Sequence, residues 1–377
     1  MQATATSPSR SNIVLWVLAV LGVGLLAVFA FPRASSPDAP LAGHGLPGGQ
    51  HVAYFAFGSS SDTLWLVDPA QPSQRRKVLV APHATDFGVV PSLAPDRRSF
   101  LFASLPATIK APSPETPADL WLSDVTGSAP SLVASGIDLL VPAVWSRDGQ
   151  STVFRRSRAA SQAAPSESRL FILDLQTGGE RELAAATDAA LFPVGFAPDG
   201  RFYLVRLDGS GSYLVTIGAA TGEQAPAVQI APGLTRDWTL SPAGTELAYL
   251  EMELTPDSVS SSAFVLDLAT GTVEPAATGD AFGPIWTSSG ELVVGQDAVN
   301  DNIASFAERG GLSLPRPARG FDVPLAFTTA GDLALVRAFE GSSAMAPGRS
   351  LLAVLGLDGS RTTIASGEVT FLGWINP

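Results

Sequence analysis

The stretch FAPDGRFYLV, residues 196–205, decides the fold that this sequence predicts. An aromatic residue, a Pro-Asp-Gly turn and an alternating apolar run are typical of two antiparallel strands joined by a tight turn. Gly200 is expected to take the left-handed conformation that such a turn needs. The stretch therefore predicts a β-hairpin.

The same hairpin frame recurs along the chain after residue 45. The turn positions fall at residues 49, 97, 149, 200, 244, 290 and 331, and each copy continues into a third strand and a short fourth one. A spacing of about 47 residues with four short strands per copy is the sequence signature of β-propeller blades. The sequence therefore predicts an all-β, seven-bladed propeller over residues 49–377, with its least regular blade across residues 297–314.

The two ends of this repeat series are incomplete. The copy at residue 49 has no strand in front of its turn, and residues 369–377 (VTFLGWINP) match that missing strand, with Trp374 in the place of Trp145 and Trp286. A strand from one end that completes the blade at the other leaves no open sheet edge between first and last blades. We therefore expect residues 369–377 to form the innermost strand of the first blade.

The repeat resembles the TolB-like, PD40-type (WD40-like) propeller family, whose repeats carry an aromatic residue and a Ser-Pro-Asp-Gly turn before an apolar strand. The turn is clear in three copies. Arg97 replaces the turn glycine in one copy, and Ala243, Ser289 and Ala330 replace the aspartate in others. The resemblance implies the propeller fold, and it implies little about function, because such propellers serve as assembly factors, sensors and enzyme appendages.

The first 48 residues predict where the propeller lies. Residues 13–31 (IVLWVLAVLGVGLLAVFAF) carry no charge and span roughly 28 Å as a helix, enough to cross a bilayer. Arg10 precedes them, which favours a cytoplasmic tail over residues 1–12. Residues 32–48 are rich in Pro, Gly and Ala and read as a flexible linker. We expect a membrane-anchored, extracytoplasmic propeller; a cleaved signal peptide is the alternative.

Composition excludes several classes of function. Hydrophobic residues make up 46% of the chain and charged residues 15%, which suits a large core. The net charge of -12 and the lack of a clustered basic face exclude a nucleic-acid partner. The chain has no Cys, which excludes disulfides and thiolate metal sites.

No catalytic constellation is visible in the sequence. The three histidines are His44, His51 and His83, and no Gly-x-Ser-x-Gly motif accompanies them. His83 with Asp86 is the one suggestive pair, and a loop histidine is expected to be solvated. We predict neither a catalytic residue nor a resident cofactor.

One set of acidic residues recurs just before the inner strands. It consists of Asp86, Asp138, Asp188, Asp237, Asp280, Asp322 and Glu368. Propeller topology places these residues on one face, near the mouth of the central channel, together with the long connections between second and third strands. The acids either accept local backbone hydrogen bonds in turns or form a ring that binds Ca²⁺ or a basic peptide.

The function predicted from these features is a protein-interaction or scaffold module, which binds a protein partner through the face that carries the acids and the long loops. The alternative is a ligand-binding or cation-binding sensor, or an enzyme, that works from the channel mouth. The alternatives differ in what they require of that face. An enzyme needs a pocket with converging polar groups, and a scaffold needs an exposed apolar patch.

Overall fold

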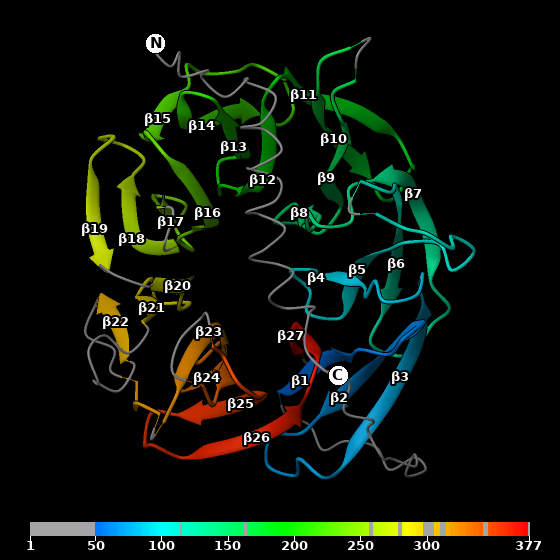
Figure 1. The fold of residues 1–377 in the computed structure, drawn as a ribbon, viewed down its shortest axis with the longest axis vertical. Coiled ribbons are helices and arrows are strands. Elements are labelled where there is room, and N and C mark those ends of the chain that lie inside the picture. Colours follow the sequence, from blue (N-terminus) through cyan, green and yellow to red (C-terminus); the bar gives the residue numbers. More distant parts are fainter. Residues whose placement is uncertain are drawn as a thin grey trace, which may run out of the picture.

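A computed structural model describes residues 50–113, 115–161, 164–255, 259–277, 281–296, 305–309, 314–317, 319–341 and 346–375. All of its secondary structure over these residues is β-strand. The sheets stand around a common centre like the blades of a propeller (Figure 1). The predicted fold class, an all-β propeller, is therefore confirmed.

Each of the first four sheets, taken in chain order, has four strands. One contains β27 (Val369–Ile375), β1 (His51–Ala56), β2 (Ser61–Val67) and β3 (Arg75–Pro82). The next contains β4 (Val90–Leu93), β5 (Ser99–Ser104), β6 (Ala118–Asp124) and β7 (Ser131–Ile137). The third contains β8 (Val144–Trp145), β9 (Ser151–Arg158), β10 (Glu167–Asp174) and β11 (Glu180–Thr187). The fourth contains β12 (Ala190–Phe196), β13 (Arg201–Asp208), β14 (Gly211–Gly218) and β15 (Val228–Ala231).

The remaining sheets differ in completeness. A four-stranded sheet contains β16 (Leu234–Leu240), β17 (Glu246–Leu254), β18 (Val259–Asp267) and β19 (Val273–Ala277). Three strands form the next sheet: β20 (Ala281–Trp286), β21 (Leu292–Gln296) and β22 (Ser305–Arg309). The last sheet contains β23 (Phe321–Phe327), β24 (Leu333–Phe339), β25 (Ser350–Gly356) and β26 (Arg361–Ser366). The expectation of seven four-stranded blades is therefore corrected: six blades are complete, and the unit predicted to be least regular has three strands among the described residues.

The ring closes as the sequence predicts. Strand β27 pairs antiparallel with β1, from His51 opposite Ile375 to Ala56 opposite Val369. Figure 1 shows the red β27 beside the blue β1 near the centre of the ring. Chain segments from the two ends of the propeller therefore share one blade, with β27 as its innermost strand.

The repeated turn has the expected geometry. Gly200 lies between β12 and β13 with φ of 81°, and its N–H donates to the carbonyl of Ala197 at 3.1 Å. The carboxylate of Asp199 accepts the N–H of Arg201 at 3.1 Å, as Asp commonly does in a turn. Arg97 occupies the equivalent position in its copy and has φ of 56°. It therefore takes a conformation that glycine adopts at lower cost.

Several innermost strands are interrupted at a proline. The pairing register shifts between Pro193 and Gly195 in β12, and between Pro324 and Ala326 in β23. A third shift, between Phe282 and Ile285 in β20, spans Pro284. Proline has no N–H for the ladder, so it is tolerated at such bulges. The prolines thus shape the inner strands, in keeping with a structural role.

The core lies between neighbouring blades. Phe202, Leu204 and Val215 pack with Val153 and Leu170 of the preceding blade. Other residues of β13 and β14 pack with the following blade, because alternate side chains of a strand point to opposite faces.

Tryptophans tie inner strands together. Nε1 of Trp145 in β8 donates to the carbonyl of Ser92 in β4 at 3.0 Å, and Nε1 of Trp286 in β20 donates to Thr239 in β16 at 3.1 Å. Trp374 occupies the matching place in β27 and is buried, but its Nε1 finds no acceptor among the residues described. The repeated tryptophan therefore forms a hydrogen bond between neighbouring blades at two positions. In β27 it contributes packing without such a hydrogen bond among the described residues.

The predicted tail, transmembrane helix and linker, residues 1–12, 13–31 and 32–48, lie outside the described residues. Within the described part, no helix is long and apolar enough to span a bilayer.

Candidate functional site on the acid-bearing face

Three of the recurring acids, Asp86, Asp138 and Asp188, lie beside the second strand of a blade or the connection that follows it. The N–H of Asp86 donates to Ser59 in the β1–β2 connection, and that of Asp188 donates to Ser166 just before β10. The N–H of Asp138 donates to the carbonyl of Arg155 in β9. These hydrogen bonds bring the acids and these connections together, as propeller topology predicts.

Two acids stand elsewhere in their blades than expected. Asp237 and Asp322 lie within the inner strands β16 and β23 instead of before them. Asp280 lies outside the described residues. Glu368 lies between β26 and β27, as expected. The strands begin earlier than the sequence indicates because register shifts after Arg236 and after Pro324 let the chain pair on both sides of a bulge.

Three of the acids have a backbone conformation that identifies them as turn or bulge residues. Asp86, Asp188 and Asp237 have φ of 65°, 53° and 54°. Among residues other than glycine, Asp and Asn tolerate this left-handed region best. The recurrence of Asp at these positions therefore has a local structural cause.

Two further acids are engaged by arginine. The carboxylate of Asp138 pairs with Nε of Arg155 and accepts the N–H of Ser157 at 3.0 Å. Asp322 is buried and accepts two hydrogen bonds from the guanidinium of Arg361, at 2.8 and 2.6 Å. A carboxylate held in this way by a cation of its own chain is poorly placed to bind a second one.

The proposed Ca²⁺ ring gains no support from this arrangement. Among the residues described, no group of three or more His, Cys, Asp or Glu side chains is arranged to hold a metal ion. Ca²⁺ requires six to eight oxygen ligands converging on one point, and the acids are instead distributed over separate blades.

His83 differs from the solvated loop residue that the sequence predicts. It is buried, its Nε2 lies 2.9 Å from Oδ1 of Asp62, and its Nδ1 lies 2.8 Å from the carbonyl of Ala84, so that protonated His83 donates to both. Its hydrogen-bonding partner is therefore Asp62, whereas Asp86 acts on it only through its charge. Burial alone would lower the pKa of His83, but these hydrogen bonds and the two carboxylates raise it above its usual value.

Asp62 joins the loop before β4 to the hairpin between β1 and β2. Its carboxylate also accepts the N–H groups of Gly58 at 3.1 Å and Val89 at 2.8 Å. Sequence reasoning missed Asp62, because it stands in a strand with no repeated motif around it. The buried pair with His83 is enclosed by Phe57, whose ring stacks on the imidazole at 5.8 Å. It fixes a loop and offers no accessible nucleophile.

An exposed apolar pair marks the same face. Strands β17 and β18 extend into the connection between second and third strands, where Leu254 lies opposite Val259. Their residues are 43% and 49% exposed. Directly opposed residues of an antiparallel pair point to the same side of the sheet, so the two side chains form one small apolar surface.

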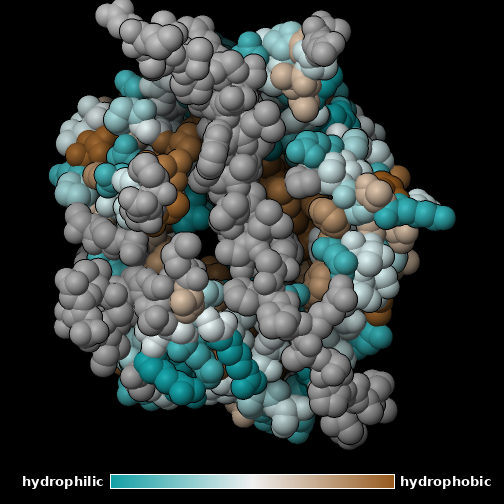
Figure 2. Space-filling model, viewed as in Figure 1, coloured by the Kyte–Doolittle hydropathy of each residue, from teal (hydrophilic) through white to brown (hydrophobic). Residues whose placement is uncertain are grey.

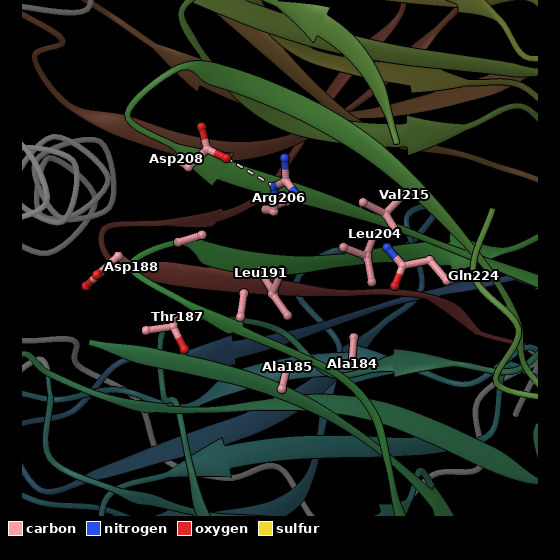
Figure 3. A pocket seen from close by; sticks show the side chains of 12 residues that line it. Ala184, Ala185, Thr187, Asp188, Leu191, Leu204, Arg206, Asp208, Val215 and Gln224 are labelled. Atoms are coloured by element: carbon pink, nitrogen blue, oxygen red, sulfur yellow. Dashed lines mark ion pairs between the residues drawn. The ribbon is translucent and has the colours of Figure 1, made fainter. Parts of the chain in front are cut away.

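A cavity of about 360 Å³ opens between β11 and the neighbouring blade. Its floor consists of Leu191, Leu204 and Val215, and Asp188 lies at one end (Figure 3). The ion pair of Arg206 and Asp208, 3.1 Å apart, borders it. The space-filling view also shows brown apolar side chains in the inner walls of the ring, between hydrophilic rims (Figure 2). Of the predicted acids, the cavity contains only Asp188.

Comparison with known proteins defines the class of fold. No protein-family model matches the sequence, and no relative is found among curated proteins. Among solved structures, the chain is similar to TolB from Acinetobacter baumannii, with a TM-score of 0.50 and 16% identity over 85% of this chain and 65% of TolB. It is also similar to oligogalacturonate lyase from Vibrio parahaemolyticus, with a TM-score of 0.52 and 13% identity over 76% and 88% of the two chains.

A third similar structure is a prolyl endopeptidase, with a TM-score of 0.59 and 13% identity over 96% of this chain and 55% of that one. The chain thus spans less than two thirds of the length of TolB and of the endopeptidase. The protein belongs to the class of β-propellers. Its fold is the TolB-like propeller that the turn motifs predict, and at these identities the likeness concerns the fold alone.

Proposed function

We propose that the protein is a β-propeller that binds a protein partner through its acid-bearing face and carries out no catalysis of its own. The observation that carries the proposal is the exposed pair Leu254 and Val259 on an extended hairpin of that face. Apolar side chains exposed together on a projecting element gain free energy when a partner covers them. The net charge of -12 and the acids nearby favour a partner with a basic rim around an apolar contact.

The enzyme and sensor alternatives gain less support. Asp86, Asp188 and Asp237 have the backbone conformation of turn or bulge residues, and Asp138 and Asp322 are held by arginine. The buried His83 is hydrogen-bonded on both nitrogens. The lyase and endopeptidase names belong to proteins that share the fold at 13% identity. Function follows from a site more than from a fold, and such a site does not appear among the described residues.

Substitution in the hairpin tests the proposal. Val259→Lys places a charge in the apolar contact, and Val228→Lys is its matched control, because Val228 is 46% exposed on the outer strand β15. Cells that express tagged full-length variants are cross-linked, and the partners are quantified by mass spectrometry. We expect the specific partner to fall about tenfold for Val259→Lys and to stay unchanged for Val228→Lys. Equal recovery from both variants contradicts the proposal.

We also propose that residues 13–31 anchor the propeller outside the cytoplasm. The proposal is supported by their nineteen uncharged residues and by Arg10 before them. The full chain is expected to resist alkaline extraction from membranes and to be digested by protease added from the extracytoplasmic side. Release of an intact propeller by alkali favours cleavage of a signal peptide instead.

A further inference from the structure

The cavity beside β11 differs from the equivalent junction one blade earlier. The turn hydrogen bonds of Ser151 and Arg201 place these residues at equivalent positions in β9 and β13, so Arg156 corresponds to Arg206. Arg156 reaches back to the preceding blade, where Nε and Nη2 donate to the carbonyl of Ser135 in β7 at 3.2 and 3.0 Å. One arginine therefore closes the junction between the second and third blades.

The arginine of the next junction behaves differently. Arg206 pairs with Asp208 within its own strand, and its guanidinium lies 4.7 Å from the centre of the Tyr213 ring. Its hydrogen bonds in the described structure include none to a carbonyl of β11. The residue equivalent to Ser135 is Ala185, three residues before Asp188 as Ser135 is before Asp138. The contact that closes one junction is missing from the other, and a cavity lies in its place.

The cavity reaches the edge of a strand. It is lined by the last four residues of β11, 184–187, and by Asp188 and Ala189 after the strand. Successive side chains of a strand point to opposite faces, so a cavity lined by all of them meets the strand along its edge. Strand β11 pairs with β10 on one side and is the outermost strand of its described sheet. An outer strand edge presents backbone donors and acceptors to an added strand.

The lining indicates what chemistry fits. Leu191, Leu204 and Val215 supply an apolar floor between the β11 alanines and the Arg206–Asp208 pair (Figure 3). The volume of about 360 Å³ is of the size that ligand sites occupy. Asp188 and Asp208 outnumber Arg206, so the charged border is net negative.

Asp208 is ionised at neutral pH. Partial burial works against ionisation, but the hydrogen bonds from Ser210 and the charge of Arg206 lower the pKa of Asp208. The carboxylate therefore contributes its full negative charge to the border of the cavity.

We propose that this cavity is a docking site for an extended peptide segment of a partner protein. The segment pairs along the outer edge of β11, inserts one side chain of leucine size between Ala186 and Leu204, and carries a basic residue beside it toward Asp188. A backbone carbonyl of the segment accepts from Arg206, as the carbonyl of Ser135 accepts from Arg156. The inference rests on the proposed function and adds the chemistry of the partner.

Binding of defined peptides tests the site. The full-length protein in lipid nanodiscs is titrated against fluorescent peptides of sequence Thr-Lys-Thr-Xaa-Thr-Lys-Thr, with Xaa either leucine or alanine, and anisotropy is measured. A third peptide carries leucine with glutamate in place of lysine. We expect saturable binding of the lysine–leucine peptide, at least about tenfold tighter than the alanine and glutamate peptides. Equal binding of the leucine and alanine peptides overturns the proposal, because it indicates adsorption to an acidic surface.

Variants locate the binding. Ala186→Leu fills the cavity and is expected to abolish binding, and Arg206→Met is expected to weaken it about tenfold. Arg201→Met is the matched control, since Arg201 lies at the other end of β13 with an exposed ion pair to Asp199. Arg206→Met keeps the test decisive if Ala186→Leu fails to fold. Unchanged affinity in Arg206→Met, or equal loss in Arg201→Met, overturns the proposal.

The experiments can contradict the hairpin interface and the β11 docking site independently of each other. Val259→Lys is expected to leave peptide binding intact, because its hairpin belongs to another blade. If cross-linked partners depend on Val259 while the peptides do not bind, the loop-face function stands and the β11 site falls. If the peptides bind at β11 while Val259→Lys retains every partner, the docking site stands without the hairpin.

Discussion

Arg97 differs from the equivalent residues of the other repeats, most of which are glycine. It takes φ of 56° where most copies carry glycine, and its Nη1 is buried without a hydrogen-bond partner among the described residues. A side chain in the left-handed region costs about 1 kcal/mol or more. The copy folds as a hairpin all the same, because Asp96 accepts the N–H groups of Arg98 and Ser99 at 2.8 and 2.9 Å.

Arg97→Gly is therefore expected to stabilise the protein by about 1 kcal/mol, and chemical denaturation measures it. Arg98→Gly is the control, because Arg98 has no positive φ and glycine there adds only chain entropy to the unfolded state. A lower stability of Arg97→Gly than of the parent protein contradicts the account of strain.

His83 makes stability depend on pH in a defined direction. Its pKa is raised in the folded protein, so the folded state binds its proton more tightly than the unfolded state does. The stabilisation is fully present below the unfolded pKa of about 6.5 and is lost as pH rises through the folded value. The groups that face His83 are Asp62, Asp86 by charge, the carbonyl of Ala84 and the ring of Phe57.

His83→Gln is expected to lose more stability at pH 5.5 than at pH 9, since glutamine cannot carry the proton. Unfolding free energies of both proteins at the two pH values measure this difference. If the two proteins differ by the same amount at both pH values, His83 is not linked to protonation in the way described.

At the scale of elements, the blades are joined by arginines as well as by apolar packing. Arg155 of β9 pairs with Asp138, donates through Nη1 to the carbonyl of Leu191 in β12 at 3.2 Å, and lies 4.6 Å from the ring centre of Phe192. Its side chain is 8% exposed. Arg155 therefore bridges two blades from a buried position, where charged hydrogen bonds are worth more than at the surface.

Arg155→Met is expected to destabilise the protein by about 2 kcal/mol, because Asp138 loses its cation and Leu191 its donor. Arg158→Met in the same strand is the control. Its side chain is 52% exposed and pairs with Glu167 at 3.4 Å, so its loss is expected to cost less than about 0.5 kcal/mol. Equal effects of the two substitutions, measured by denaturation, would show that the bridge contributes nothing.

The elements also show how far sequence reasoning reaches. The Asp-Gly turn at residue 200 predicts its hairpin, because local backbone chemistry decides such turns. The arginine bridges, the register shifts at Pro193 and Pro324, and the His83–Asp62 pair could not be predicted. They depend on which residues meet across blades or loops, and no spacing along the chain encodes that meeting.

The same limit applies to the recurring acidic residues. Their recurrence was visible, and the left-handed φ of Asp86, Asp188 and Asp237 explains it locally. Packing between blades decides which of these acids is bound by arginine and which lies beside a cavity. The cavity at β11 lies beside Arg206, which pairs with Asp208 in its own strand, and sequence alone does not indicate that pairing.

At the scale of the whole molecule, the ring depends on β27. Deletion of residues 369–377 is expected to abolish cooperative unfolding, because β1 loses its inner neighbour along six residue pairs and Trp374 leaves the core. Thermal melting followed by circular dichroism measures the loss. A deletion variant that melts as sharply, and at the same temperature, as the full chain contradicts the role of closure.

The pairing of β27 with β1 also has a consequence for folding during translation. During translation β1 is synthesised long before β27, the strand that completes its blade. One edge of β1 therefore lacks its partner strand while the other blades are synthesised. Such an edge recruits foreign strands, and pairing between distant segments forms slowly. We therefore expect the nascent propeller to need a holding chaperone until its last strand is released, whichever compartment it folds in.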